Sequence, residues 1–374
     1  MFIRAEKKDS AFLRNLPRPD RAFHYKRVSS RQGVIKKTRK LNYDTMEITV
    51  ACNEGDRVSP IFAKAGQYVT LFSDLIGAPR AFSLCRAPAN DAPNEHTIMI
   101  RLVPGGKFSG WLFAEDRTGA NLTVTGPMGR FGLDDDNRPI VCIAGGSGFS
   151  AIKALLEEAV VQQVPRNCLF LYGARAQRDL YYEEEMRAIK SGWHPGHRFD
   201  FVQVLSEEPF SSDWKGPRGL VGDYFRATYI ERGVVDAANT SFFVCGPPPM
   251  VEAAELMLRD QHVPEGNIAY DRFSDANSPS PELDNTKCVL CEECLYVRPV
   301  EDCIVEIAAY TRTNGSKGGV SLIQPGQTAG LYYTTLFVND EKCIRCNACV
   351  DVCPVGAFAP QAKPRRWSLS RLQS

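Results

Sequence analysis

The sequence predicts a multidomain fold: an antiparallel β-barrel, then a doubly wound α/β domain, then a small α+β domain rich in cysteine. Residues 33–134 have the pattern of short alternating strands separated by turn residues. Residues 135–275 alternate between strand and helix patterns. Eight of the 13 cysteines fall within residues 288–353. A chain of 374 residues is long enough for two or three such domains.

The composition is that of a soluble globular protein, with 44% apolar and 24% charged residues. A net charge of +1 gives no general attraction to nucleic acid or to an anionic membrane. No apolar run approaches the roughly 20 residues of a membrane span, and the first residues lack the apolar core of a signal peptide. We therefore expect a cytoplasmic protein with no nucleic-acid partner and no membrane span.

Four segments flank or connect the predicted domains. Residues 1–32 carry nine Lys/Arg against three Asp/Glu and predict a basic N-terminal arm, solvated or used for docking. Residues 276–286 are rich in Pro and Ser and predict a linker. The cysteine-rich domain then spans residues 287–360, and a basic tail follows at 361–374.

In the barrel, strands are predicted at residues 33–40, 46–51, 68–72, 97–103 and 121–125. Two stretches between them carry chemistry. The first is Arg80-Ala-Phe82-Ser83, where a guanidinium can hold a phosphate while an aromatic ring and a hydroxyl meet a flavin. The second precedes a helix-like segment, and its free N–H groups suit a pyrophosphate: Gly105, Gly106, Lys107, Phe108 and Ser109. Each occurs widely by chance, but their order and spacing reinforce each other.

The α/β domain opens with a strand at 139–144, a glycine turn and a helix at 149–159. Such a turn at a helix N-terminus is an anion site for a dinucleotide. The turn residues are Gly145, Gly146, Ser147 and Gly148. They do not complete G-x-G-x-x-G, so a tight turn without a ligand is the alternative.

The cysteines of the third domain form two runs. Cys343, Cys346 and Cys349 have the spacing C-x2-C-x2-C and are followed by Cys353-Pro354, which matches the bacterial [4Fe-4S] run. The second run, of the same spacing, is Cys288, Cys291 and Cys294, with Cys303 further on. Clustered cysteines without a signal peptide disfavour a disulfide framework. Zinc sites of four cysteines remain the alternative to two clusters.

Five ordered motifs across residues 33–275 resemble the ferredoxin–NADP reductase superfamily, most closely its NADH-dependent oxygenase reductases. They are Arg80-x-Phe82-Ser83, Gly106-x-x-Ser109, Gly145-Gly-Ser-Gly148, Tyr172-Gly-Ala-Arg175 and Cys245-Gly246-Pro247. The resemblance implies that the first two bind FAD rather than FMN. It implies that the glycine turn, Gly246, Pro247 and Met250 contact the nicotinamide dinucleotide. Ser83 and Cys245 would then shape hydride transfer as the catalytic residues.

The choice between NADH and NADPH rests on the charges near the ribose. Arg175 is a candidate partner for a 2′-phosphate, but Ser206 is followed by Glu207 and Glu208. Two carboxylates would repel a phosphate if they lie near it, so we expect NADH.

The cysteine-rich domain resembles bacterial dicluster ferredoxins, which implies crossed ligation. One [4Fe-4S] cluster would take Cys288, Cys291, Cys294 and Cys353, and the other Cys343, Cys346, Cys349 and Cys303. Ile304 replaces the proline expected after Cys303, so the second cluster is the one open to change, for example to a labile or [3Fe-4S] form.

No Ser-His-Asp or paired-carboxylate constellation stands out, so we expect cofactors to carry the chemistry. The leading hypothesis is an oxidoreductase that passes electrons from NADH through FAD and two [4Fe-4S] clusters to a terminal acceptor protein, an oxygenase or demethylase. One alternative is reverse flow, from a low-potential donor to NAD(P)+. Another makes the cysteine domain a redox sensor or a structural metal module.

Overall fold

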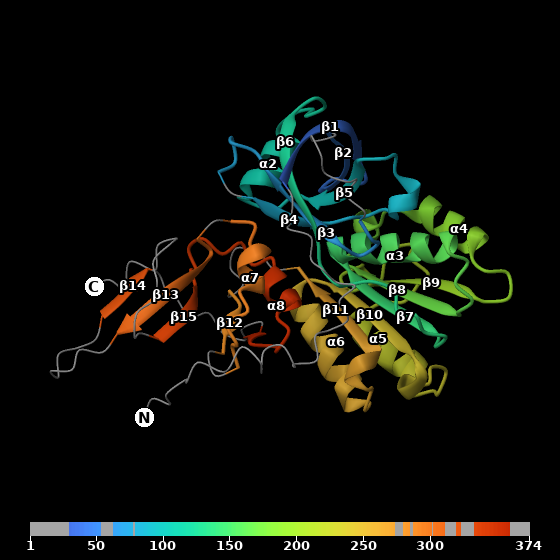
Figure 1. Ribbon diagram of the computed structural model, residues 1–374. Coiled ribbons are helices and arrows are strands. Elements are labelled where there is room, and N and C mark those ends of the chain that lie inside the picture. Colours follow the sequence, from blue (N-terminus) through green and yellow to red (C-terminus); the bar gives the residue numbers. More distant parts are fainter. Residues whose placement is uncertain are drawn as a thin grey trace. The chain divides into compact units, whose positions relative to one another are not determined.

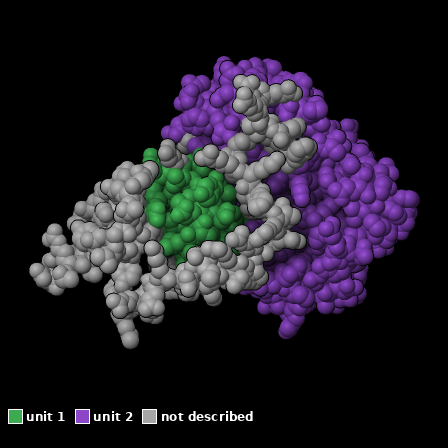
Figure 2. Space-filling model, viewed as in Figure 1, with its two compact units in different colours: residues 1–29, 275–374 green, residues 30–274 purple. Residues whose placement is uncertain are grey.

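The computed structural model describes residues 30–53, 63–77, 79–273, 280–284, 287–300, 302–310, 319–322 and 333–359 (Figure 1). The chain divides into two compact units, residues 30–274 and residues 275–374 together with 1–29 (Figure 2). The predicted tail and residues 1–29 of the predicted arm lie outside the described residues. The first strand begins at Ser30, so the last three residues of the predicted arm belong to the sheet instead.

The first part of residues 30–274 is an antiparallel sheet in the order β4-β3-β6-β1-β2-β5. A bridge between Leu84 and Ile98 joins the two ends of this order, as a barrel requires. Alternate residues point inward, and α2 (Lys107–Ala114) adds Phe108 and Leu112 to the core. The strands are β1 (Ser30–Lys40), β2 (Thr45–Cys52), β3 (Tyr68–Phe72), β4 (Arg80–Ser83), β5 (Glu95–Arg101) and β6 (Asn121–Met128).

The second part is a parallel sheet in the order β11-β10-β7-β8-β9. Its strands are β7 (Ile140–Gly145), β8 (Cys168–Ala174), β9 (Phe199–Leu205), β10 (Ser241–Gly246) and β11 (Ile268–Arg272). The chain runs outward from β7 to β9 and then returns to the other side of β7. The order therefore reverses between β7 and β10, and the carboxyl ends of these two strands mark the position where doubly wound sheets bind ligands.

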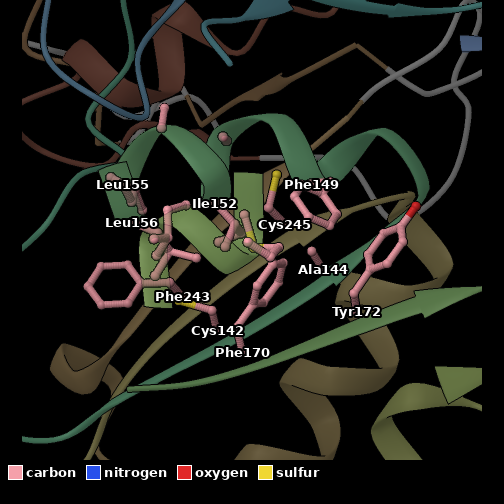
Figure 3. Packing of buried hydrophobic residues seen from close by; sticks show 14 of the residues in the cluster. Cys142, Ala144, Phe149, Ile152, Leu155, Leu156, Phe170, Tyr172, Phe243 and Cys245 are labelled. Atoms are coloured by element: carbon pink, nitrogen blue, oxygen red, sulfur yellow. The ribbon is translucent and has the colours of Figure 1, made fainter. Parts of the chain in front are cut away.

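Helices cover both faces of the parallel sheet (Figure 1). One face packs against α3 (Phe149–Val161) and α4 (Glu183–Gly192), the other against α5 (Val221–Phe225) and α6 (Pro248–Asp260). Figure 3 shows the core under α3, where Ile152 and Leu155 belong to one buried cluster with Phe243 of β10. The strands are apolar on both faces because both are covered.

The described residues of the unit 275–374 include two short helices, α7 (Glu293–Tyr296) and α8 (Ala348–Val352), one beginning at the end of each C-x2-C-x2-C run. Three antiparallel strands pair in the order β14-β13-β15, and β12 pairs with β16. The bounds are β12 (Glu282–Leu283), β13 (Ile304–Tyr310), β14 (Gly319–Leu322), β15 (Tyr333–Val338) and β16 (Phe358–Ala359). Residues 282–283 of the predicted linker pair with β16 as part of this unit.

Candidate functional site

Side chains from two strands, β4 and β10, meet on one carboxylate oxygen of Asp271, which lies on a third strand, β11. The Ser83 hydroxyl at the end of β4 donates to Oδ2 of Asp271 over 3.3 Å, and the Cys245 thiol of β10 lies 3.7 Å from the same oxygen. Burial raises the pKa of Asp271 to about 6, although the hydrogen bonds from Cys245 and Ser83 oppose this rise. The two predicted catalytic residues thus come together, on an acid that the sequence analysis did not select.

Cys245 is fully buried. Burial, and then the negative charge of Asp271, raise the pKa of its thiol well above the usual range. The side chain therefore remains a neutral thiol at neutral pH. It can donate a hydrogen bond to Asp271, but it is not a thiolate nucleophile.

The glycine turn after β7 is packed too closely to accept side chains. A Cβ on Gly148 would lie 2.2 Å from the carbonyl oxygen of Cys245, and one on Gly145 would lie 2.4 Å from Sδ of Met250. Gly146 has a φ of 51°, in the left-handed region that glycine adopts readily. The glycines therefore bring the turn against the end of β10, where Cys245 lies.

A cavity of about 240 Å³ opens beside this turn. Of the predicted dinucleotide residues, Gly145, Gly146, Arg175, Pro247 and Met250 line it, together with Ser206. Tyr172 of the fourth motif also lines it, and so do residues that the sequence analysis missed, among them Asp44, Arg101, Asp179, Tyr181 and Leu220. A cavity with exposed glycine backbone at a switch point fits a dinucleotide.

The cations of the cavity are paired with its acids. Arg101 reaches from the end of β5 and donates to Asp44 over 2.8 Å. Arg175 lies 3.6 Å from Asp179 and donates to the hydroxyl of Tyr43 over 3.2 Å. The positive charges of two arginines and the negative charges of two aspartates on the cavity wall are therefore equal in number.

Neither Glu207 nor Glu208 lines this cavity. Glu208 instead accepts hydrogen bonds from the backbone N–H and side chain of Gln177. The carboxylates that line the cavity are Asp44 and Asp179, rather than the two glutamates that the sequence suggested.

The predicted flavin motif lies on β4, paired with β3. The ring of Phe82 lies 5.1 Å from that of Phe108 at the start of α2. The Ser109 hydroxyl accepts from the N–H of Val103 over 3.0 Å, so it supports the glycine turn from within. Gly105 has a φ of 72°, and a Cβ there would meet no atom within 4 Å. The open turn and the N-terminus of α2 offer the free N–H groups that suit a pyrophosphate.

The two cysteine loops have the same backbone pattern. Leu290 and Glu292 in the first, and Arg345 and Asn347 in the second, all have φ between 53° and 63°. These left-handed residues occupy equivalent positions between the cysteines of each C-x2-C-x2-C run. Backbone N–H groups also approach sulfur, as from Ala357 to Sγ of Cys353 over 3.1 Å. Tight loops with N–H groups directed at sulfur fit the thiolates of an iron–sulfur cluster.

The eight cysteines fall into two neighbouring sets. Cys294 interacts electrostatically with Cys291, Cys288 and Cys353, and burial with these neighbours raises its pKa to about 12. In the other set, Cys349 interacts electrostatically with Cys346, Cys343 and Cys303, and also with Cys294 of the first set. A small cavity of about 20 Å³ is lined by Cys294, Cys303, Cys343, Cys346 and Cys349.

Two negative findings concern only the described residues. Within them, no three His, Cys, Asp or Glu side chains are grouped closely enough to hold a single metal ion. In the same part of the chain, no helix is both long and apolar enough to cross a bilayer.

Comparison with known proteins agrees with this architecture. Residues 142–256 match the family of oxidoreductase NAD-binding domains, and residues 336–359 match that of 4Fe-4S binding domains. The xylene/toluene monooxygenase electron transfer component of Pseudomonas putida is 40% identical over 241 residues, 64% of this chain and 65% of that protein. This chain thus spans just under two thirds of that relative's length.

Two further relatives come from Amycolatopsis. The reductase subunit of an aromatic O-demethylase is 32% identical over 249 residues, 64% of this chain and 71% of that protein. The crystal structure of a cytochrome P450 reductase superposes with a TM-score of 0.58 at 30% identity, covering 66% of this chain and 71% of that one.

An antiparallel sheet joined to a doubly wound sheet, with a dinucleotide cavity at the switch point, defines a nicotinamide-dependent oxidoreductase. The chain carries a 4Fe-4S domain in addition. It belongs to the ferredoxin–NADP reductase superfamily, and its relatives are reductase components of oxygenase systems.

Proposed function

We propose that this protein is the reductase component of an oxygenase or demethylase system. It takes electrons from NADH, passes them through FAD and two [4Fe-4S] clusters, and delivers them to a separate terminal enzyme. The observation that carries the proposal is the meeting of Ser83 and Cys245 on Asp271. This meeting joins β4, the strand of the flavin motif, to β10, whose end packs against the dinucleotide turn.

The residues of this meeting point would orient the two rings. When bound, a flavin would supply the chemistry that takes a hydride from nicotinamide and releases electrons one at a time. Iron–sulfur clusters carry single electrons. Ser83 would present its hydroxyl to the flavin edge, held in place by Asp271. Cys245, a buried neutral thiol, would pack against the nicotinamide. Asp271, whose pKa is raised to about 6, can hold or release a proton one hydrogen bond away from the Ser83 hydroxyl.

The preference for NADH follows from the charges of the cavity. Arg175, the candidate partner for a 2′-phosphate, is already paired with Asp179, so its charge is not free for the additional phosphate of NADPH. The two aspartates suit ribose hydroxyls instead. When the pyrophosphate binds, Arg101 is the cation placed to meet it, since Nη1 would lie 3.5 Å from a Cβ on Gly146.

The two sets of cysteines support crossed ligation of two clusters, with Cys353 joining the first run and Cys303 the second. The partner is proposed from the relatives, whose names include a xylene/toluene monooxygenase and an aromatic O-demethylase.

The test is an anaerobic titration of the metal-replete protein with NADH and then NADPH, followed by visible absorption and EPR spectra. We expect NADH to bleach the flavin first and paramagnetic clusters to appear next, with NADPH less effective. A reduced flavin beside oxidised clusters would contradict the forward direction and favour reverse flow or a sensor. Failure of NADH to reduce any flavin would contradict the whole proposal.

A further inference from the structure

A buried polar cluster within residues 30–274 has no part in the chemistry proposed above. It connects the antiparallel sheet with helices α3 and α4, and we call it the latch. From the sheet come Arg39, Glu47 and the backbone of residues 85–87; from the helices come Lys153, Glu157, Tyr182 and Glu185.

The first arm of the latch is a buried lysine. Lys153 of α3 is only 2% exposed, and its ammonium donates to the carbonyl oxygen of Cys85 over 2.9 Å and to Glu157 over 2.5 Å. The other oxygen of Glu157 accepts the N–H of Ala87 over 2.9 Å. Two side chains of one helix thus hold the backbone that directly follows the flavin motif on β4.

The second arm runs through a tyrosine. Tyr182, whose φ is 63°, donates its hydroxyl to Glu47 of β2 over 2.6 Å. Arg39 of β1 donates to Glu47 through two nitrogens, over 3.1 and 3.2 Å. Burial alone would raise the pKa of Glu47, but the hydrogen bonds from Tyr182 and Arg39 lower it, so it is a carboxylate. The ammonium of Lys153 lies 5.0 Å from the centre of the Tyr182 ring, which links the arms.

Stability alone does not explain this arrangement. Burying a lysine and a glutamate costs several kcal/mol of desolvation per ion, and well-packed apolar residues of similar volume are often as stabilising. Unlike apolar contacts, ion pairs and charged hydrogen bonds fix the direction and the distance between the groups that they join. The position of the latch indicates that the separation it fixes is the one between the flavin motif and the dinucleotide turn.

The latch is a second connection between the two cofactor motifs, beside the meeting of Ser83 and Cys245 on Asp271. Lys153 lies five residues beyond Gly148 on α3, about 7.5 Å along a helix that begins at the dinucleotide turn. Cys85 lies two residues beyond Ser83 of the flavin motif. Along the chain, by contrast, more than sixty residues separate Ser83 from Gly148.

We propose that Lys153 and Tyr182 are positioning residues, and that the latch sets the distance between the flavin-binding strand and the dinucleotide turn. This inference rests on the proposed function, because that distance matters only if a hydride crosses it. Transfer rates are sensitive to displacements of about 1 Å, whereas binding within one half of the site is not.

The test compares Lys153→Met, Lys153→Arg and Tyr182→Phe with the wild-type holoprotein. Lys190→Met is the matched control, since Lys190 is an exposed lysine of α4. Four quantities are measured for each: FAD content, affinity for ADP-ribose, the rate at which NADH bleaches the flavin, and charge-transfer absorbance of the dithionite-reduced protein titrated with NAD+.

We expect Lys153→Met and Tyr182→Phe to keep the FAD content and the ADP-ribose affinity. We expect the bleaching rate to fall about tenfold and the charge-transfer absorbance to weaken, with part of both restored in Lys153→Arg. Because Tyr182→Phe removes a single hydroxyl, it tests the latch even if Lys153→Met does not fold.

Wild-type rates and absorbance in folded Lys153→Met or Tyr182→Phe would overturn the proposal. So would losses of rate that match losses of FAD or ADP-ribose binding, because these would indicate a purely structural role. A wild-type protein whose flavin NADH does not reduce would instead refute the proposed function, and the positioning role with it.

Discussion

Replacing Asp271 by asparagine should change how the stability of the flavin-free protein depends on pH. Folding raises the pKa of this carboxyl from 3.8 to about 6, mainly through burial. A raised carboxyl pKa means that the folded state binds the proton more tightly than the unfolded state does. Stability therefore falls as the pH rises from about 4 to about 6, and the loss is complete above that range. A shift of about two units corresponds to at most about 3 kcal/mol.

About half of this loss, roughly 1.4 kcal/mol, falls between about pH 5 and about pH 8. The side-chain amide introduced by Asp271→Asn has no proton to lose, so the variant should gain this amount relative to the wild type over the same interval. Urea unfolding of both proteins at a series of pH values measures the difference in the free energy of unfolding. Asp260→Asn at the exposed end of α6 is the control for the loss of one carboxylate.

Parallel pH curves for the wild type and Asp271→Asn would refute the reasoning. They would mean that the carboxyl has the same pKa in the folded and unfolded states. Ser83 and Cys245 would then not be held by a buried acid that titrates near neutral pH. A gain equally large in Asp260→Asn would refute it as well, because the effect would then be one of net charge.

Three further substitutions test the site. Gly148→Ala should abolish NAD+ binding, because its Cβ would lie 2.2 Å from the Cys245 carbonyl oxygen; unchanged affinity by calorimetry would contradict that packing. Arg101→Met should weaken NAD+ binding roughly tenfold, the value of one charge-assisted hydrogen bond, and an equal affinity would remove Arg101 from the pyrophosphate site. Cys303→Ser should lower the iron content by about half, with Cys52→Ser as the control, and full iron content would contradict its role as a ligand.

The sequence predicted most of the architecture because periodicity and turn residues are local signals. Alternating strands, the glycine turn and the two cysteine runs are each contained within a dozen residues. The bridge that joins Leu84 to Ile98 has no such signal, since it depends on how the whole sheet curls. Strand β12, within the predicted linker, has no such signal either, because two residues are too few to show a period.

The missed site residues are those defined by contacts between distant segments. Asp271 is 188 residues from Ser83 and looks like an ordinary polar residue in a short strand. Arg101 and Asp44 reach the cavity from the antiparallel sheet, where nothing local marks them as ligands. Lys153 gave one detectable signal: a lysine among apolar residues in the segment Phe149–Val161. The sequence does not show which groups accept hydrogen bonds from the Lys153 ammonium and so offset the cost of burying it.

The left-handed residues of the cysteine loops have a consequence for biogenesis. Leu290, Glu292, Arg345 and Asn347 are not glycines, and each costs roughly 1 kcal/mol or more in this conformation. Metal binding can recover such a cost, so that cluster insertion and folding become one equilibrium. In iron-poor cells, newly made chains should then be proteolysed first at these loops, while residues 30–274 persist. Iron supply would thereby set the abundance of the complete electron carrier after translation.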